Sequence, residues 1–152
     1  MSERLNQRIC FNFYQGWREI TSFYKDIYGN DITPQNVYLL QLCSLNKGVT
    51  IKQLSEGMGL DSSAVSTLVA RMEKKNLIKR THGIEDRRTV FVELTQEGLQ
   101  LKEDINAKAD LLADSMNINI TAEESKVLQS IVMKIKLNRE PIERSQARVF
   151  NG

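Results

Sequence analysis

The hydrophobic period of the chain changes at Leu77, and this change limits the folds that it can adopt. Before Leu77, apolar residues recur every three or four positions, as they do along one face of a helix. After it, two short runs rich in β-branched residues flank the polar segment His82–Asp86, which contains a glycine. Runs of this kind around a polar tip predict a β-hairpin. We therefore expect helices up to residue 75 and a hairpin built from Ile78–Arg80 and Thr89–Leu94.

Capping residues separate four helices before the hairpin. Threonine and aspartate accept hydrogen bonds from the first turn of a helix, and glycine or asparagine favours the left-handed conformation that ends one. Together with the apolar spacing, these signals predict helices over residues 4–28, from Pro34 through Leu45 to a stop at 46–48, from Thr50 through Met58 to Gly59, and over 62–75 after Asp61, with Asn76 as a left-handed residue.

Two further helices follow the hairpin. Thr95 begins a fifth helix whose apolar side runs from Leu99 to Met116, and a capping box at residues 121–124 begins a sixth. Pro141 and the charged residues around it mark a tail. The predicted fold class is mainly α with a small β-hairpin wing, a winged helix-turn-helix flanked by long helices. We divide the single domain 1–152 into a winged region 32–99, flanking helices 1–31 and 100–138, and a tail 139–152.

The composition fits one domain with its own core. The chain has 152 residues, of which 41% are hydrophobic and 26% charged. No apolar run approaches the ~20 residues that span a bilayer, and the polar start of the chain lacks a signal peptide, so we expect no membrane association. Two cysteines are too few for a disulfide scaffold and indicate a reducing compartment. A single histidine argues against a metal site, and we expect no cofactor.

Basic residues concentrate where the helical period gives way to the hairpin. Residues 71–90 carry seven lysines and arginines against three carboxylates, a local charge of +4. The whole chain carries only +2, so the remaining residues sum to −2. A cationic cluster on a near-neutral body is typical of a protein that meets an anionic partner at one place. A basic face that is merely solvated is the alternative.

The helix over residues 62–75 has the properties of a recognition helix, the element that enters the major groove of double-stranded DNA. Four residues on one side follow helical spacing and are expected in the core: Val65, Leu68, Val69 and Met72. The other side carries small and hydroxylated residues, which can lie deep in a groove and donate to phosphates and bases. We predict DNA contacts there from Ser62, Ser63, Ser66, Thr67 and Arg71. An exposed helix that is merely rich in serine is the alternative.

The hairpin tip carries Asp86-Arg87-Arg88. Arginines at a wing tip can insert into a narrow minor groove, where negative potential is concentrated. A carboxylate beside DNA needs a reason, and we expect Asp86 to hold the guanidinium of Arg87 or Arg88 bidentately and so aim it. An ordinary surface ion pair is the alternative. Further DNA contacts are expected from Lys79, Arg80 and His82, the last as a phosphate contact or a bystander.

Three stretches of sequence carry a family resemblance. They are residues 54–66, which contain Leu60-Asp61-Ser62-Ser63-Ala64-Val65-Ser66, residues 71–80, which read Arg-Met-Glu-Lys-Lys-Asn-Leu-Ile-Lys-Arg, and residues 86–98, which contain Asp-Arg-Arg and end in Leu-Thr-Gln-Glu-Gly. In this order and spacing they resemble the MarR family of bacterial transcriptional regulators, over about residues 5–138. Asn76 stands where most members have glycine, a change that the turn chemistry permits.

The resemblance implies a cytoplasmic homodimer, joined by the first, fifth and sixth helices, that places two winged regions on one pseudo-palindromic operator. It also implies repression, or less often activation, relieved by a small ligand or by oxidation. The dimer has independent support, because these three helices carry wide apolar faces that a small winged region cannot cover. Two-fold symmetry would set the half-sites roughly one helical turn, ~34–36 Å, apart.

Cys10 raises the question of a redox switch. Tyr14 follows it by one turn and Tyr24 by fourteen residues, a spacing similar to that in the thiol-based peroxide-sensing branch of the family. In that branch tyrosines hydrogen-bond a cysteine of the first helix, which implies a redox site of Cys10, Tyr14 and Tyr24. Thr33 departs from the branch, which has a third tyrosine there. A buried, inert cysteine is the alternative, and Cys43 is expected in the core.

The resemblance also implies a site for a small aromatic anion between the flanking helices and the winged region. Four aromatic residues can line such a pocket: Trp17, Tyr24, Tyr28 and Tyr38. Aromatic residues at helical spacing are more often simply part of a core, and that is the alternative.

Two classes of function therefore compete. The first is a sequence-specific, dimeric, DNA-binding regulator, and the second is a winged-helix protein-interaction module without DNA binding. The Asp86-Arg87-Arg88 tip and the local charge of +4 favour the first. An enzyme is not expected, because the sequence contains no recognisable nucleophile–base pair, phosphate loop or metal cluster.

Overall fold

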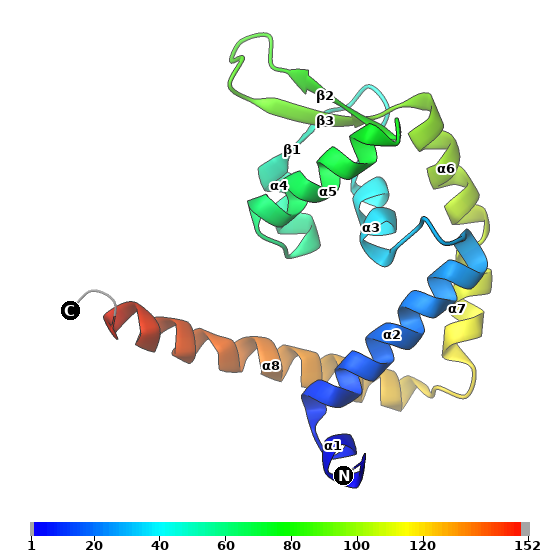
Figure 1. Cartoon of the computed structure of the whole chain (residues 1–152), viewed down its shortest axis with the longest axis vertical. Helices are drawn as coiled ribbons and strands as arrows, with labels where there is room; N and C mark the ends of the chain where they lie inside the picture. Colours follow the sequence, from blue (N-terminus) through cyan, green and yellow to red (C-terminus); the bar gives the residue numbers. More distant parts are fainter. Residues whose placement is uncertain (1, 150–152) are drawn as a thin grey trace. The chain divides into compact units, whose positions relative to one another are not determined.

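The chain divides into two units, and the first, residues 1–116, contains all the strands and every helix before α8 (Ala122–Val149) (Figure 1). The computed structural model describes residues 2–149, and the side chains of residues 4–139. In chain order the elements are α1 (Ser2–Asn6), α2 (Ile9–Tyr28), α3 (Pro34–Leu42), β1 (Val49–Thr50), α4 (Ile51–Met58), α5 (Ser62–Lys74), β2 (Ile78–His82), β3 (Val90–Leu94), α6 (Gln96–Ala107) and α7 (Ala109–Asn117), which crosses the boundary of the unit by one residue. The predicted fold class, a winged helix-turn-helix with flanking helices, is confirmed.

The caps that divide the winged region lie where the sequence predicts them. Thr33 and Thr50 each form a capping box at the start of α3 and α4, and the Asp61 carboxylate accepts from the backbone N–H of Ala64 at 2.8 Å to open α5. Asn76 is left-handed, with φ 57°, and Gly59 closes α4 with φ 65°. The helix-turn-helix α4–α5 is therefore specified locally.

Three predicted helix boundaries are wrong. The expected helix over 4–28 is broken at Arg8, which is extended, and the Asn12 amide donates to the Asn6 carbonyl oxygen across the break. The second helix ends at Leu42 rather than Leu45, because Cys43 turns to an extended conformation. The fifth helix is divided between α6 and α7 at Lys108, whose ψ of 0° interrupts the helical backbone.

The hairpin belongs to a three-stranded sheet of order β1-β3-β2, in which both pairings are antiparallel. The two-residue strand β1 was not predicted. Its pairing with β3 joins Val49 to Val92 and Thr50 to Phe91. A strand this short has no alternation from which the sequence could reveal it.

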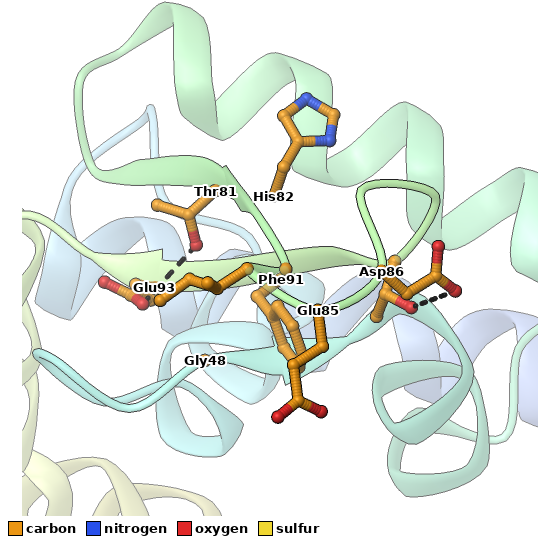
Figure 2. A pocket seen from close by; sticks show the side chains of 10 residues that line it. Gly48, Thr81, His82, Glu85, Asp86, Phe91 and Glu93 are labelled. Atoms are coloured by element: carbon orange, nitrogen blue, oxygen red, sulfur yellow. Dashed lines mark hydrogen bonds between the residues drawn. The ribbon is translucent and has the colours of Figure 1, made fainter.

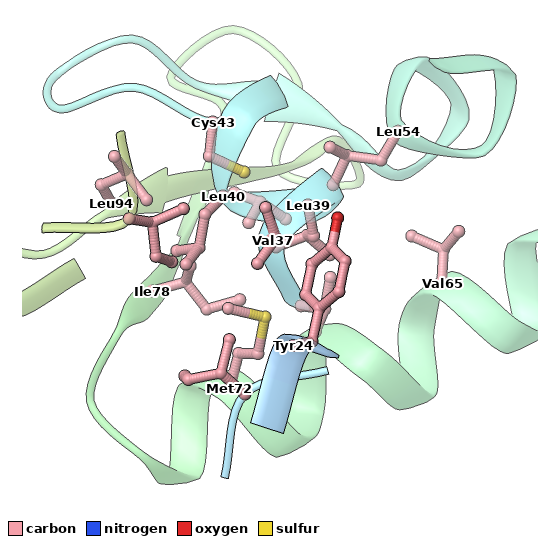
Figure 3. Packing of buried hydrophobic residues seen from close by; sticks show 14 of the residues in the cluster. Tyr24, Val37, Leu39, Leu40, Cys43, Leu54, Val65, Met72, Ile78 and Leu94 are labelled. Atoms are coloured by element: carbon pink, nitrogen blue, oxygen red, sulfur yellow. The ribbon is translucent and has the colours of Figure 1, made fainter. Parts of the chain in front are cut away.

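The hydrophobic core lies where α3, α4, α5 and the sheet meet (Figure 3). Its fully buried side chains, at most 1% exposed, include Leu39, Leu40, Cys43, Leu54, Val65, Val69, Met72, Ile78 and Leu94. Val65, Val69 and Met72 of α5 are buried as predicted, whereas Leu68 is only half-buried. Burial of each large aliphatic side chain stabilises the fold by about 1.5–3 kcal/mol, so the inner face of α5 fixes its orientation.

The first turn of α6 packs directly on the turn between α5 and β2. The Thr95 hydroxyl donates to the Asn76 carbonyl oxygen at 2.6 Å and accepts from the Gly98 N–H at 3.0 Å. A Cβ at residue 98 would collide with the carbonyl oxygen of Leu77. Glycine is therefore required at position 98 by this close approach.

The second unit, residues 117–152, consists mainly of helix α8 (Ala122–Val149). Its predicted capping box is present, and in it the Thr121 N–H donates to the Glu124 carboxylate at 2.8 Å. Hydrogen bonds with the backbone and side chain of Thr121 lower the pKa of Glu124. The interpretation of Pro141 as the start of a tail is wrong, since α8 continues to Val149. A proline lacks a backbone N–H and so removes one helical hydrogen bond, but α8 continues on both sides of Pro141. Residues 150–152 of the expected tail lie outside the described residues.

Candidate nucleic-acid interface

Helix α5 presents a hydroxylated and cationic face opposite its buried side. Ser62, Ser63, Thr67 and Arg71 are exposed, and Ser66 is half-buried. A hollow of about 480 Å³ lies along this face, here called the α5 hollow. Its lining residues are Ser63, Ser66, Thr67, Ala70, Arg71, Lys74 and Arg80. The structure therefore brings together most of the residues predicted for this helix, and adds Lys74.

Lys74 is a residue that the sequence interpretation missed. Positions 63, 67, 70 and 74 follow helical spacing, so its place on the same face was available from the period alone. Ser62 lies just outside the hollow, and its hydroxyl accepts from Ser55 of α4 at 3.4 Å. The Thr67 hydroxyl donates to the Ser63 carbonyl oxygen at 3.1 Å, which leaves its lone pairs as acceptors.

Strand β2 sends its two predicted cations to opposite faces of the sheet. Arg80 is opposite Val92 in the register and lies on the face that packs against α5, where its Nε is 3.2 Å from the Glu73 carboxylate. Lys79 is opposite Glu93 on the other face and pairs with it at 3.4 Å. The α5 hollow thus includes Arg80, and Lys79 lies away from it.

The predicted partner of the Asp86 carboxylate, an arginine guanidinium, is wrong. The carboxylate of Asp86 accepts from the backbone N–H of Arg88 at 2.9 Å and from the Thr89 hydroxyl at 3.4 Å. It forms an Asx turn, in which a short carboxylate satisfies the backbone two residues on. Among the side chains that the structure describes, no ion pair joins Asp86 to a guanidinium. Asp86 shapes the backbone that carries both arginines, which are exposed.

His82 closes the same loop from its other end. Its Nδ1 atom lies 3.0 Å from the Arg87 carbonyl oxygen, and with its proton on Nδ1 the imidazole donates to that oxygen. Gly83 donates its N–H to the Thr89 carbonyl oxygen at 3.0 Å, which continues the ladder beyond β2. The predicted contact residue His82 is therefore a support of the loop in this structure.

A second hollow, of about 690 Å³, lies on the face of the hairpin away from α5 (Figure 2). It is lined by Gly48, Thr81, His82, Gly83, Ile84, Glu85, Asp86, Thr89, Phe91 and Glu93. The Phe91 ring lies beside Gly48, where an added Cβ would stand 2.6 Å from the Phe91 Cβ. Three carboxylates around this hollow make it unsuited to a nucleic-acid backbone.

Three of the four predicted pocket aromatics form a cluster in the first unit. The rings of Tyr24 and Tyr28 meet edge to face at 5.6 Å, and the Tyr28 hydroxyl donates to the Ile105 carbonyl oxygen at 3.4 Å. Burial, followed by a hydrogen bond with Tyr38, raises the pKa of Tyr24 well above its ordinary value. Trp17 lies two turns earlier on α2 and is 43% exposed. None of the four lines either hollow described above.

Of the proposed redox residues, Tyr14 lies one turn from Cys10 on α2, whereas Tyr24 is far from both within one chain. Cys10 is exposed in the first turn of α2, so a buried, inert Cys10 is wrong for the single chain. Tyr24 stands fourteen residues along the same helix, ~21 Å away at the helical rise. Cys43 is buried as predicted, and its burial raises the pKa of its thiol to about 11.

Metal and membrane features can be stated for the described part of the chain. Among the described side chains of residues 4–139, no three from His, Cys, Asp or Glu gather as a metal site. Within the described backbone of residues 2–149, no helix has both the length and the hydropathy of a membrane span.

A helix-turn-helix followed by a basic β-wing defines a winged-helix DNA-binding protein. The family model described as MarR family matches residues 30–89. The organic hydroperoxide resistance transcriptional regulator of Bacillus subtilis is 36% identical over 102 residues, which cover 66% of this chain and 69% of the relative. The HTH-type transcriptional regulator SarZ of Staphylococcus epidermidis is 32% identical over 128 residues, or 82% and 83% of the two chains.

Solved structures share the fold at lower identity. The PcaV transcriptional regulator from Streptomyces coelicolor, in complex with its natural ligand, has a TM-score of 0.77 at 17% identity over 90% of this chain and 96% of that one. The S. aureus MepR–DNA complex has a TM-score of 0.72 at 20% identity over 86% and 98%. The chain belongs to the MarR family. It is a DNA-binding transcriptional regulator rather than an enzyme.

Proposed function

We propose that the chain binds double-stranded DNA by placing α5 in the major groove, with the α5 hollow against the base edges and phosphates. One observation carries this proposal: the hollow gathers three hydroxyls and three cations on a single accessible face. Small hydroxylated side chains allow close approach to base edges, and arginine and lysine neutralise phosphates. Ser62, beside the hollow, extends this face toward the start of α5.

The wing supplies the second contact. Arg87 and Arg88 are exposed at the loop that Asp86 and His82 hold, so both guanidinium groups can reach the adjacent minor groove. Lys79 is paired with Glu93 on the far face of the sheet and contributes mainly to the long-range charge. His82 and Asp86 act through the loop rather than by contact with DNA.

The regulator acts as a homodimer on a pseudo-palindromic operator. In the first unit α2 exposes an apolar stripe of Ile9, Phe13 and Trp17, and in the second unit α8 exposes Val127, Leu128 and Ile135. Exposed apolar stripes of this extent mark a protein interface. A second copy of the chain would bury them by two-fold symmetry, and the two recognition helices would then meet half-sites ~34–36 Å apart.

We further propose that the dimer works in the cytoplasm as a repressor released by a small ligand or by oxidation. Two relatives support these two kinds of signal: the B. subtilis protein is a regulator of organic hydroperoxide resistance, and PcaV was solved in complex with its natural ligand. On the chain itself, exposed Cys10 and the cluster of Tyr24, Tyr28 and Tyr38 are the corresponding features. Tyr14 lies one turn from Cys10 on α2, and a partner chain would have to supply a second phenol.

The test is a titration of labelled DNA from the region upstream of the gene, followed by fluorescence anisotropy at several salt concentrations. Neutralised phosphates release counterions, so log K should fall linearly with log salt, with a slope of about −0.9 per phosphate contact. Arg71→Ala should weaken binding, and light scattering should show a dimer that Phe13→Glu disrupts. Affinity independent of salt would contradict the proposed mode of DNA binding.

A further inference from the structure

Glu73 is an acidic residue beside the cationic face of α5. Its carboxylate lies 3.2 Å from the Nε of Arg80, and the two side chains are 43% and 37% exposed. A carboxylate close to the path of a phosphate backbone repels it, so by charge alone Glu73 should weaken DNA binding. Its contact with Arg80 gives it a second effect of the opposite sign.

The contact restrains how Arg80 enters the α5 hollow. The stem of Arg80 begins on β2, opposite the fully buried Val92, and its guanidinium borders the hollow formed mainly by α5. A guanidinium has five N–H donors in a fixed plane. Because the Glu73 carboxylate lies beside Nε, the ion pair restrains the guanidinium on that side, and the two terminal nitrogens remain for a phosphate or a base edge.

We infer that Glu73 is a positioning residue that holds the Arg80 guanidinium for operator DNA and, by its charge, disfavours DNA of other sequence. It raises the ratio of specific to non-specific affinity rather than the affinity as a whole. This inference rests on the proposed placement of the α5 hollow against DNA.

The same hairpin contains a matched ion pair that lacks this geometry. Lys79 and Glu93 lie 3.4 Å apart on the sheet face away from α5. Removal of the Glu93 charge changes the net charge of the protein as much as removal of the Glu73 charge. It leaves the α5 hollow unaltered, so Glu93→Gln separates an effect of total charge from an effect of position.

The experiment measures the affinity of each dimer for two duplexes of equal length, by anisotropy at one salt concentration. One duplex carries the inverted repeat from upstream of the gene, and the other has the same bases in shuffled order. The variants are Glu73→Ala, Glu73→Gln, Arg80→Ala, the double variant Glu73→Ala/Arg80→Ala, and Glu93→Gln. Thermal unfolding of each variant checks that it is folded. If Glu73→Ala is not folded, Glu73→Gln replaces it in the comparison.

We expect Glu73→Ala to weaken operator binding by about three- to tenfold and to leave shuffled DNA bound equally or more tightly. In the Arg80→Ala background the same substitution should tighten binding to both duplexes, because only the repulsion is then removed. Glu93→Gln should alter both affinities by the same small factor.

The inference is overturned if Glu73→Ala tightens operator and shuffled DNA alike while Arg80→Ala still weakens operator binding. It is also overturned if Glu73→Ala has the same effect with and without Arg80. The proposed DNA-binding mode fails separately, if the unaltered protein binds the two duplexes equally or shows no dependence on salt.

Discussion

The imidazole of His82 lies 3.0 Å, through Nδ1, from the carbonyl oxygen of Arg87, so the end of β2 is joined to the far side of the wing loop. Asp86 holds the backbone N–H of Arg88 at 2.9 Å. Two short contacts therefore set the backbone from which both wing arginines extend. Their removal should change DNA binding without removing any group that faces DNA.

His82→Ala should weaken operator binding by about two- to fivefold. A hydrogen bond contributes about 0.5–1.5 kcal/mol net, and we expect part of this free energy to stabilise the loop in its DNA-bound conformation. Amide hydrogen exchange of residues 83–89 should become faster in the same variant. His82→Asn, which retains a donor nitrogen, should recover part of both effects. Unchanged exchange together with weakened binding would instead indicate a direct contact between His82 and DNA.

Asp86→Ala should weaken DNA binding even though it removes a negative charge from the wing. The loss of the Asx turn frees the backbone at Arg88, and the arginines then lose conformational freedom when they bind. Asp86→Asn keeps an acceptor oxygen and should bind nearly as well as the unaltered protein. Anisotropy titrations decide the matter, and tighter binding by Asp86→Ala would show that charge outweighs loop geometry. Glu85→Ala, at an exposed neighbour, is the control for charge.

Arg87→Ala should lower the salt slope of operator binding by about 0.9, the value of one phosphate contact. Lys79→Ala should leave the slope almost unchanged, because Lys79 pairs with Glu93 on the face away from α5. Both variants lose one positive charge, so the comparison tests position at equal charge. Equal slopes in the two variants would contradict the placement of the wing tip against DNA.

The fold should lose stability at alkaline pH. Burial raises the pKa of the Cys43 thiol to about 11 from an ordinary value of 9.0, and it also raises the pKa of Tyr24 and Tyr28. The unfolded chain releases these protons first as pH rises. The contribution of the protonated Cys43 thiol to the stability of the fold is therefore complete below pH 9, and it is lost as pH rises from 9 toward 11.

Urea unfolding at pH 7.5 and pH 10 measures this effect. For Cys43 alone the decrease in the free energy of unfolding should be about 1 kcal/mol by pH 10. Cys43→Ala should reduce the decrease, although a small cavity will lower its stability at every pH. An equal decrease in the variant would assign the alkaline loss to other groups.

Features encoded by one or two adjacent residues could be predicted from the sequence. Thr50, Asp61 and Asn76 act on the helix ends beside them, and the structure places all three as expected. The hydroxylated face of α5 followed from its period alone. Non-local pairing could not be predicted: β1 exists because Val49 and Thr50 meet β3 more than forty residues later in the chain.

The errors at the site also have a physical cause. The Asp86 carboxylate can accept from an arginine fork or from the backbone N–H two residues on, and both partners are close in sequence. In the turn, the carboxylate accepts from the backbone N–H of Arg88 rather than from an arginine side chain. The Glu73–Arg80 pair joins a helix to a strand across the turn at Asn76, so neither a helical nor a strand period indicates it.

The absence of a side chain at residue 98 has a mechanical consequence. With no atoms to slide or rotate between α6 and the Leu77 carbonyl oxygen, the first turn of α6 and the base of the hairpin form one stiff joint. We therefore expect a tilt of α6 to move the base of the hairpin with it. The positions of the wing arginines would then follow the axis of α6.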